Sequence, residues 1–270
     1  MTAVLRVEHL TKRFGGLVAV RDVDMAVAPQ EILAIIGPNG AGKTSLFNLI
    51  TGFLPPTSGD IYFRDQRITG LAASRIASLG IIRTFQNLLI FNETTVAENV
   101  MVGCHRWTHT GLLHAALALP AAVREDRQVS DTAREALAVV GLERREHDLA
   151  RDLPFGQQRL LEIARALVAR PAVLLLDEPT AGLSAQEARD LVTLIRRLRA
   201  DGSTFVVIEH NMDVVMEAAD RVVVLDYGEK IAVGPPQAIQ QDPRVIAAYL
   251  GEDVAAVSRS GGDASPGGAP

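Results

Sequence analysis

The sequence has little cysteine, few aromatic residues and no surplus of basic charge. A single cysteine in 270 residues excludes an intrachain disulfide scaffold. The 27 Lys and Arg against 32 Asp and Glu give a net charge of −5, which disfavours a nucleic-acid-binding protein, because neutralising phosphates needs a cationic surplus or a dense basic patch. There is also no run of about 18 uncharged apolar residues, and the first residues lack the apolar segment of a signal peptide, so we expect a cytoplasmic chain without a membrane span.

What is present is a large amount of aliphatic side chain. Hydrophobic residues make up 48% of the chain and aromatic residues only 4%, so Ala, Val, Leu and Ile carry the hydrophobicity. Such a composition can form a packed core, which excludes disorder for most of the chain. Short aliphatic runs are typical of buried parallel strands covered by helices.

The order of the apolar segments predicts an α/β fold. The first thirty residues alternate apolar and polar, as antiparallel strands do. Continuous aliphatic runs predict buried strands at 31–36, 81–85, 172–176, 204–208 and 221–225. Helical spacing predicts helices at 43–50, about 96–140, 157–170 and 184–200, the last capped by Ser184. Because strands alternate with helices, the sheet should be largely parallel, whereas the Gly/Ser/Ala/Pro tail should be disordered.

A glycine-rich segment between the first buried strand and the first helix fits the pattern G-x-x-x-x-G-K-[ST]. Its glycines would let backbone N–H groups converge on phosphate oxygens at a helix N-terminus. Lys43 would meet the β- and γ-phosphates, and the Thr44 hydroxyl would ligate Mg²⁺. The alternative is a plain glycine turn, which the strand before and the helix after disfavour. The predicted nucleotide-binding residues are Gly37, Pro38, Asn39, Gly40, Ala41, Gly42, Lys43, Thr44 and Ser45.

Two acidic residues end another aliphatic strand, which begins at Val173. Parallel sheets bind ligands at the carboxyl ends of their strands. Asp177 therefore fits a Mg²⁺ ligand, and Glu178 fits the group that positions or deprotonates the water attacking the γ-phosphate. Taken alone, the pair could equally be two solvated loop charges. Together with the glycine-rich segment, this pair of acids favours a nucleoside triphosphatase.

Further segments in the same order resemble the ATP-binding cassette (ABC) ATPases, from Leu5 to Leu250. These are Phe14 before Gly15-Gly16, Gln86 within 83–87, the segment 153–159, the loop 181–184, and His210 after a strand. The resemblance implies a P-loop NTPase fold with a mostly parallel core sheet, an antiparallel β subdomain and a helical subdomain. It places one ABC domain at 4–250, the helical subdomain at about 88–170, and a disordered tail at 251–270.

The resemblance also implies roles for residues outside the two motifs. Phe14 would stack on adenine, while Gln86 and His210 would join Glu178 as catalytic residues. Gln86 would also ligate Mg²⁺ beside Thr44 and Asp177. Gly156 and Gln157, which open a helix in the family's signature segment (residues 153–159), would bind the γ-phosphate held by a second subunit.

The signature segment and the loop 181–184 depart from the family pattern. Pro154 stands in place of the signature serine, Phe155 in place of its first glycine, and Ser184 in place of the usual aspartate. Since Gly156 and Gln157 remain, we expect a working but altered signature.

Several segments look more particularly like the branched-chain amino-acid importer ATPases. The segments that show this resemblance are residues 14–20, 83–87, the helical insert of about 97–140, 156–159 and 248–251. This implies an ATP- and Mg²⁺-dependent subunit, peripheral on the cytoplasmic face of the membrane. Its partners would be permease subunits, a second ATPase and, indirectly, a substrate-binding protein, but no nucleic acid.

Two other functions compete with amino-acid import. One is an exporter ATPase for lipid or lipopolysaccharide. The other is a soluble ABC ATPase acting on DNA or ribosomes, which the single cassette and the net charge of −5 disfavour. A zinc site is a further possibility, but the candidate ligands lack a second pair such as C-x₂-C, so a polar part of the helical insert is the better interpretation. Those candidate ligands are Cys104, His105, His109 and His114.

Overall fold

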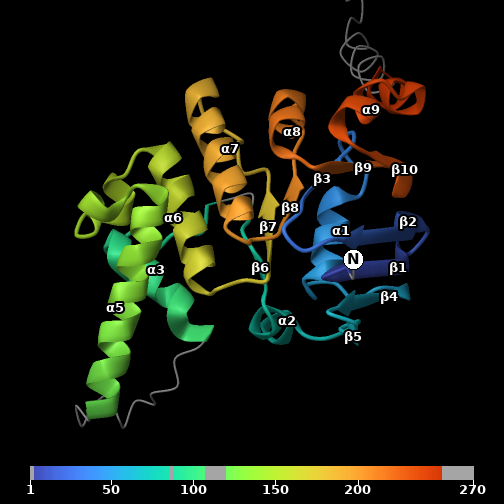
Figure 1. The fold of residues 1–270 in the computed structure, drawn as a ribbon. Helices are drawn as coiled ribbons and strands as arrows, with labels where there is room; N and C mark the ends of the chain where they lie inside the picture. Colours follow the sequence, from blue (N-terminus) through green and yellow to red (C-terminus); the bar gives the residue numbers. More distant parts are fainter. Residues whose placement is uncertain (1–2, 86–87, 107–119, 251–270) are drawn as a thin grey trace, which may run out of the picture.

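The computed structural model describes residues 3–85, 88–106 and 120–250. Its centre is a six-stranded sheet in the order β10-β9-β3-β8-β7-β6 (Figure 1). The strands from β9 to β6 run parallel and β10 pairs antiparallel with β9, so the prediction of a largely parallel core sheet is confirmed. The strands are β3 (Ile32–Ile36), β6 (Ile81–Arg83), β7 (Val173–Asp177), β8 (Phe205–Ile208), β9 (Arg221–Asp226) and β10 (Glu229–Gly234).

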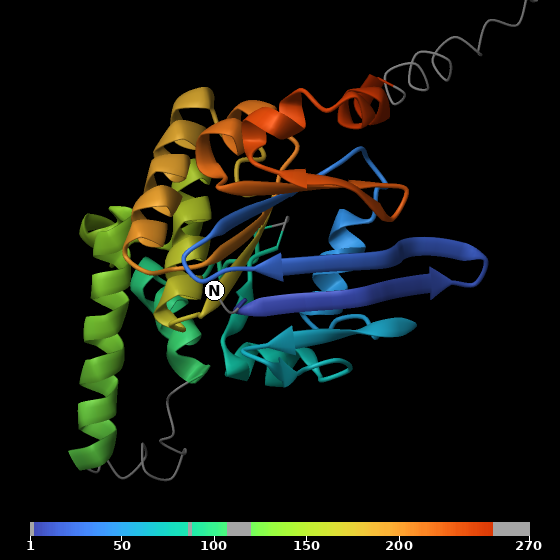
Figure 2. The same cartoon turned by 45° about the vertical axis from the view of Figure 1, so that its right-hand side comes forward.

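A second sheet of four antiparallel strands, in the order β2-β1-β4-β5, lies beside the first. Its strands β1 and β2 form the long hairpin that extends to the right in Figure 2. The prediction of antiparallel strands from the alternating pattern of the first thirty residues is therefore confirmed. The strands are β1 (Leu5–Phe14), β2 (Leu17–Val27), β4 (Ser58–Phe63) and β5 (Gln66–Arg67).

Helices cover both faces of the central sheet. On one face α1 (Lys43–Ile50) packs with alternate residues of β3 and β7, such as Ile35 and Leu175, and with the antiparallel sheet. On the other face α3 (Val96–Gly103), α5 (Pro120–Val140), α6 (Phe155–Val168) and α7 (Ala185–Ala200) pack on the intervening residues, such as Leu174. The strands β3, β7 and β8 are buried at every position, as continuous aliphatic runs require.

The structure corrects several predicted boundaries. The strand at 81–85 ends at Arg83, and the helix at 157–170 begins two residues earlier and ends at Val168. The helical insert was predicted with interruptions at Gly111 and Pro120. In its described residues it contains α3, which passes into a 3₁₀ helix (Cys104–Arg106), and α5, which begins at Pro120. Six short elements were not predicted. They are the strands β4, β5 and β10, and the helices α2 (Ala73–Leu79), α8 (Met212–Ala218) and α9 (Pro236–Gln240).

Cys104 is fully buried in the cluster formed by the helices α3, α5 and α6. This burial raises the pKa of its thiol to about 11. Within the described part of the chain, Cys104 and His105 belong to no group of three possible metal ligands. His109, His114 and the predicted tail lie outside the described residues.

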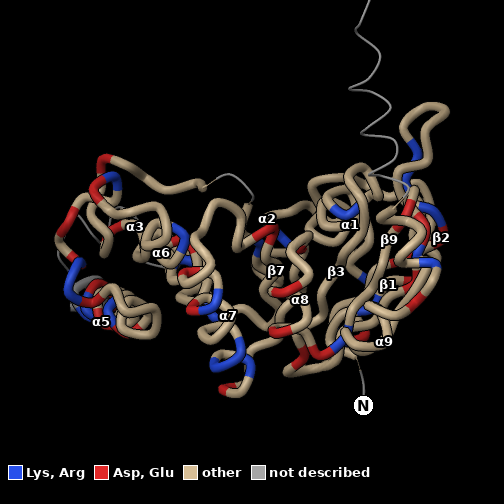
Figure 3. Tube along the Cα trace, turned by 90° about the horizontal axis from the view of Figure 1, so that it is seen from above, with Lys and Arg blue, Asp and Glu red and all other residues tan. Residues whose placement is uncertain are grey.

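Basic and acidic positions are interleaved along the outer helices α5 and α7 (Figure 3). No helix in the described ranges has the length and apolarity needed to cross a membrane.

Candidate nucleotide site

The phosphate loop (residues 37–44) connects β3 with α1, and its conformation requires glycine. Gly37 and Gly42 have φ values of 149° and 99°, in the left-handed half of backbone space. A Cβ atom at Gly37 would lie 2.0 Å from the Leu225 carbonyl oxygen, and one at Gly42 would lie 2.3 Å from that of Ala19. Any other residue would therefore displace the loop from the strands that hold it.

The N-terminus of α1 is available to an anion. Gly42 is the N-cap residue, no described side chain caps this helix start, and its first turn contains no acidic residue. The first N–H groups and the positive end of the helix dipole can therefore meet phosphate oxygens. Lys43 is buried, with its ammonium donating to the carbonyls of Gly37 at 2.6 Å and Pro38 at 3.0 Å, whereas Thr44 is exposed in the first turn.

The carboxyl ends of β7 and β8 bring Asp177, Glu178 and His210 to one edge of the sheet. The strands are parallel neighbours, and the Glu178 N–H donates to the Ile208 carbonyl at 3.0 Å. The His210 Nδ1 lies 3.8 Å from the Glu178 Oε2, and their side chains are 57% and 21% exposed. The two predicted catalytic side chains are therefore close, accessible and able to share a proton or a water.

Glu178 has an unusual backbone, with a φ of 48°. A left-handed conformation is rare for a residue with a Cβ and is often found where a side chain has to be aimed. Here it lets the chain turn sharply after β7, so that Asp177 points into the protein and Glu178 remains more accessible.

Three other predicted site residues lie on elements other than the phosphate loop. Phe14 ends β1 at the tip of the hairpin, is 46% exposed, and lies 5.0 Å from the Lys12 ammonium. Gly156 and Gln157 start α6, which packs on the face of the sheet opposite α1 (Figures 1 and 3). Within one chain, therefore, the signature segment does not meet the phosphate loop. Gln86 lies outside the described residues.

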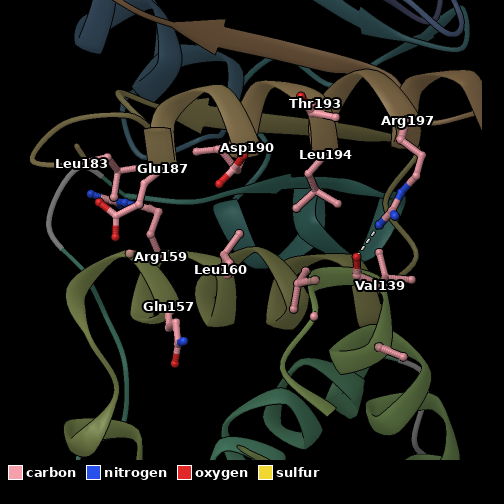
Figure 4. Close-up of a pocket in the computed structure, with 15 residues that line it drawn as sticks. Val139, Gln157, Arg159, Leu160, Leu183, Glu187, Asp190, Thr193, Leu194 and Arg197 are labelled. Atoms are coloured by element: carbon pink, nitrogen blue, oxygen red, sulfur yellow. Dashed lines mark hydrogen bonds between the residues drawn. The ribbon is translucent and has the colours of Figure 1, made fainter. Parts of the chain in front are cut away.

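The signature segment is fitted closely against the loop that follows Glu178. A Cβ on Gly182 would lie 2.9 Å from the Phe155 ring, and a Cβ on Gly156 would lie 2.3 Å from a Glu187 carboxylate oxygen. Ser184 caps α7 in a capping box with Glu187, which confirms the cap predicted from the sequence. Figure 4 shows Glu187 and Leu183 above Arg159, at one end of a cavity of about 570 Å³ between α5, α6 and α7.

Replacing Pro154 with serine should leave ATPase activity intact or raise it. Pro154 is the N-cap residue of α6, has extended backbone angles and has no side-chain group that can accept a hydrogen bond. Serine there can accept from the first turn, which typically contributes about 0.5–2 kcal/mol, against a loss of about 0.4–1 kcal/mol of proline rigidity. The rate of phosphate release measures the ATPase activity, and the melting temperature measures the change in stability. A collapse of activity with an unchanged melting temperature would show that Pro154 shapes the site itself.

Four buried charged residues around the site were missed in the sequence. Glu209 is 1% exposed and accepts from the N–H and hydroxyl of Thr180, at 3.1 and 2.7 Å, so it anchors the loop after Glu178. Its burial raises the pKa of the Glu209 carboxyl. The position of Glu209, directly after a buried strand and before His210, could have indicated in the sequence that it lies near the site. The others are the pair of Arg159 and Glu162, and Arg83.

This fold and site, with a glycine phosphate loop and paired acids on a mostly parallel sheet, define an ATP-binding cassette. The family model described as ABC transporter matches residues 20–181, and the chain belongs to that family. It is thus an ATP-binding and ATP-hydrolysing subunit, of the kind that dimerises and partners with transmembrane permease components. Within the family, the model described as branched-chain amino acid ATP-binding cassette transporter matches residues 229–255.

Similar proteins and solved structures belong to the same class of ATP-binding cassettes. The chain is 45% identical over 250 residues to the high-affinity branched-chain amino acid transport ATP-binding protein LivG of Escherichia coli strain K12, covering 92% of this chain and 98% of that protein. It is 44% identical, with the same coverage, to BraF of Pseudomonas aeruginosa. The ADP conformation of the ATP-binding cassette MJ1267 is similar with a TM-score of 0.81 and 34% identity, over 93% of this chain and 100% of that one.

Proposed function

We propose that this chain hydrolyses Mg²⁺-ATP to drive import of branched-chain or other hydrophobic amino acids through a permease, from the cytoplasmic face of the membrane. The observation that carries the proposal is the 45% identity to LivG over 92% of the chain. The match of residues 229–255 to a branched-chain transporter model supports the same substrate class. A substrate-binding protein would deliver the amino acid on the other side of the membrane.

The phosphate loop and the edge of the sheet supply the residues for this reaction. The loop amides and Lys43 bind the phosphates, and Phe14 stacks on the adenine. Thr44 and the buried Asp177 carboxylate offer the oxygen donors that Mg²⁺ prefers, and a bound Mg²⁺ would neutralise charge on the β- and γ-phosphates. Glu178 orients and deprotonates the attacking water, and His210 hydrogen-bonds the γ-phosphate or that water.

A second subunit completes the site in this proposal. The signature segment lies across the central sheet from the phosphate loop of its own chain. The N-terminus of α6, with Gly156 and Gln157, can therefore reach a γ-phosphate only when it belongs to the opposing subunit, in a head-to-tail pair. A solved ATP-binding cassette with 25% identity and a TM-score of 0.73 is a dimer.

A surface groove suits the permease. This docking groove, of about 570 Å³, is bounded by α2, the end of β6, α3 and α6. Leu89 and Val102 line it and are 52% and 50% exposed. It includes Thr84 and Phe85, which directly precede the predicted catalytic residue Gln86. A permease segment seated there would contact the chain beside the nucleotide site.

The double variant Leu89→Glu/Val102→Glu should lose the permease. Burying two unpaired carboxylates is strongly unfavourable, so we expect copurification with the permease to fall at least about tenfold. Val233→Glu, at a position 51% exposed on β10, is the matched control and should retain the permease. An equal yield of complex from the groove variant and the control would contradict this docking site.

Transport itself tests the substrate class. The complex of this ATPase with its permease and binding protein, reconstituted in vesicles, should take up leucine, isoleucine or valine only with ATP. Transfer of lipid without uptake of any hydrophobic amino acid would overturn the proposal.

A further inference from the structure

Arg83 joins the proposed metal ligand to the end of β6. Its guanidinium donates to the Asp177 Oδ2 at 2.5 Å and, through its other terminal nitrogen, to the Asn48 Oδ1 on α1 at 2.5 Å. The side chains of Arg83 and Asp177 are 5% and 4% exposed. Two aromatic rings also flank the guanidinium, and their centroids lie 5.5 Å (Phe47) and 5.1 Å (Phe85) from its carbon atom.

This arrangement gives Asp177 two competing uses. A buried carboxylate needs a partner, and Arg83 provides one without any nucleotide. Arginine brings a full positive charge and a planar set of donors to this contact. A Mg²⁺ ion on the same carboxylate would be repelled by that positive charge at short range, in surroundings that screen it poorly.

Arg83 is also one of the residues that line the docking groove. Thr84 and Phe85 line it as well. Thr84, which follows Arg83, is held by β7, because its N–H donates to the Leu175 carbonyl at 2.9 Å. The Phe85 N–H donates to Glu162, and the Phe85 carbonyl accepts from Arg159, both at 3.3 Å. A partner seated in the groove would therefore press on the segment that carries the guanidinium.

We propose that Arg83 is a positioning residue that holds Asp177 in the metal-free site, lowers its affinity for Mg²⁺, and lets an occupant of the docking groove change that affinity. It acts through Asp177 and has no contact with the reacting atoms. The proposal rests on the Mg²⁺ site of the proposed function.

The test is a Mg²⁺ titration of the full chain at fixed ATP, followed by the fluorescence of a labelled ATP analogue. Arg83→Met and Arg83→Gln remove the charge and should lower the Mg²⁺ concentration at the midpoint by at least about tenfold, because a neighbouring charge at this range has an effect near that order even with water-like screening. Arg83→Lys keeps the charge and should stay close to wild type. If the Met variant does not fold, the Gln and Lys variants still make the comparison.

The control is Arg67→Met, which removes an exposed arginine from its pair with Asp60 at 2.6 Å and should not shift the midpoint. Folded neutral variants with an unchanged or higher midpoint would overturn the proposal. A wild-type protein whose ATP binding ignores Mg²⁺ would instead overturn the metal site on which the proposal rests.

Assembly with the permease tests the link to the groove. The wild-type midpoint should move at least about threefold when the permease is added, and that of Arg83→Gln should move less. Equal movement in both would show that groove occupancy reaches the metal site without Arg83.

Discussion

Glu178→Gln should bind ATP with nearly wild-type affinity and lose about 10²- to 10⁴-fold in turnover, the usual contribution of a positioned general base. Glutamine keeps the size and hydrogen-bonding reach of the side chain but cannot take up a proton. The side chain is accessible at the end of β7 and lies 3.8 Å from His210, so the attacking water can sit between them. Steady-state phosphate release and binding of a fluorescent ATP analogue measure the two quantities separately.

Glu217→Gln is the matched control, since this exposed glutamate lies on the neighbouring helix α8. The control should hydrolyse ATP at the wild-type rate. Near-normal hydrolysis by Glu178→Gln would remove Glu178 as the catalytic carboxylate, and lost binding in that variant would show that its main role is structural.

Lys43→Ala should weaken nucleotide binding by about 10- to 100-fold, the range expected for losing one charge-assisted hydrogen bond to phosphate. The ammonium now bridges the Gly37 and Pro38 carbonyls, within the loop that surrounds the proposed phosphate position. Its removal takes away the loop's only lysine and leaves the backbone amides to bind the phosphates alone. Calorimetry with ATP gives the affinity directly.

Lys230→Ala is the control for Lys43→Ala, because this exposed lysine donates to the Asp24 carbonyl at 2.6 Å, at the surface of the antiparallel strands. Equal affinities of Lys43→Ala and wild type would contradict the assignment of residues 37–44 to phosphate binding.

The sequence predicted those elements of the fold whose burial leaves a clear pattern of apolar residues. Strands such as β3 and β7 are buried on both faces, so each appears as a continuous aliphatic run followed by glycine or acid. The short elements β4, β10 and α8 do not show such a pattern, since their stability comes from packing on neighbours that are distant in sequence. Helix α6 begins at Phe155, two residues before the prediction, because its first turn packs on Gly182 instead of following an apolar stripe.

The site was predictable where a single segment carries the chemistry. The phosphate loop, the acids after β7 and the Ser184 cap each depend on adjacent residues, and their positions follow from strand order. Arg83 and Asp177 are 94 positions apart, so nothing in the local sequence links them. Glu209 was overlooked because an acid beside a histidine is usually solvated, whereas this one is buried beneath Thr180.

The separation of α1 and α6 by the central sheet has a consequence for how the cell controls ATP consumption. A single chain cannot fold its own signature onto its own phosphate loop, because the central sheet lies between them. In the proposed mechanism, newly made subunits that have not found a partner therefore hold nucleotide without consuming it. Energy expenditure then begins at assembly, and the number of completed transporters, more than the number of chains, sets the rate.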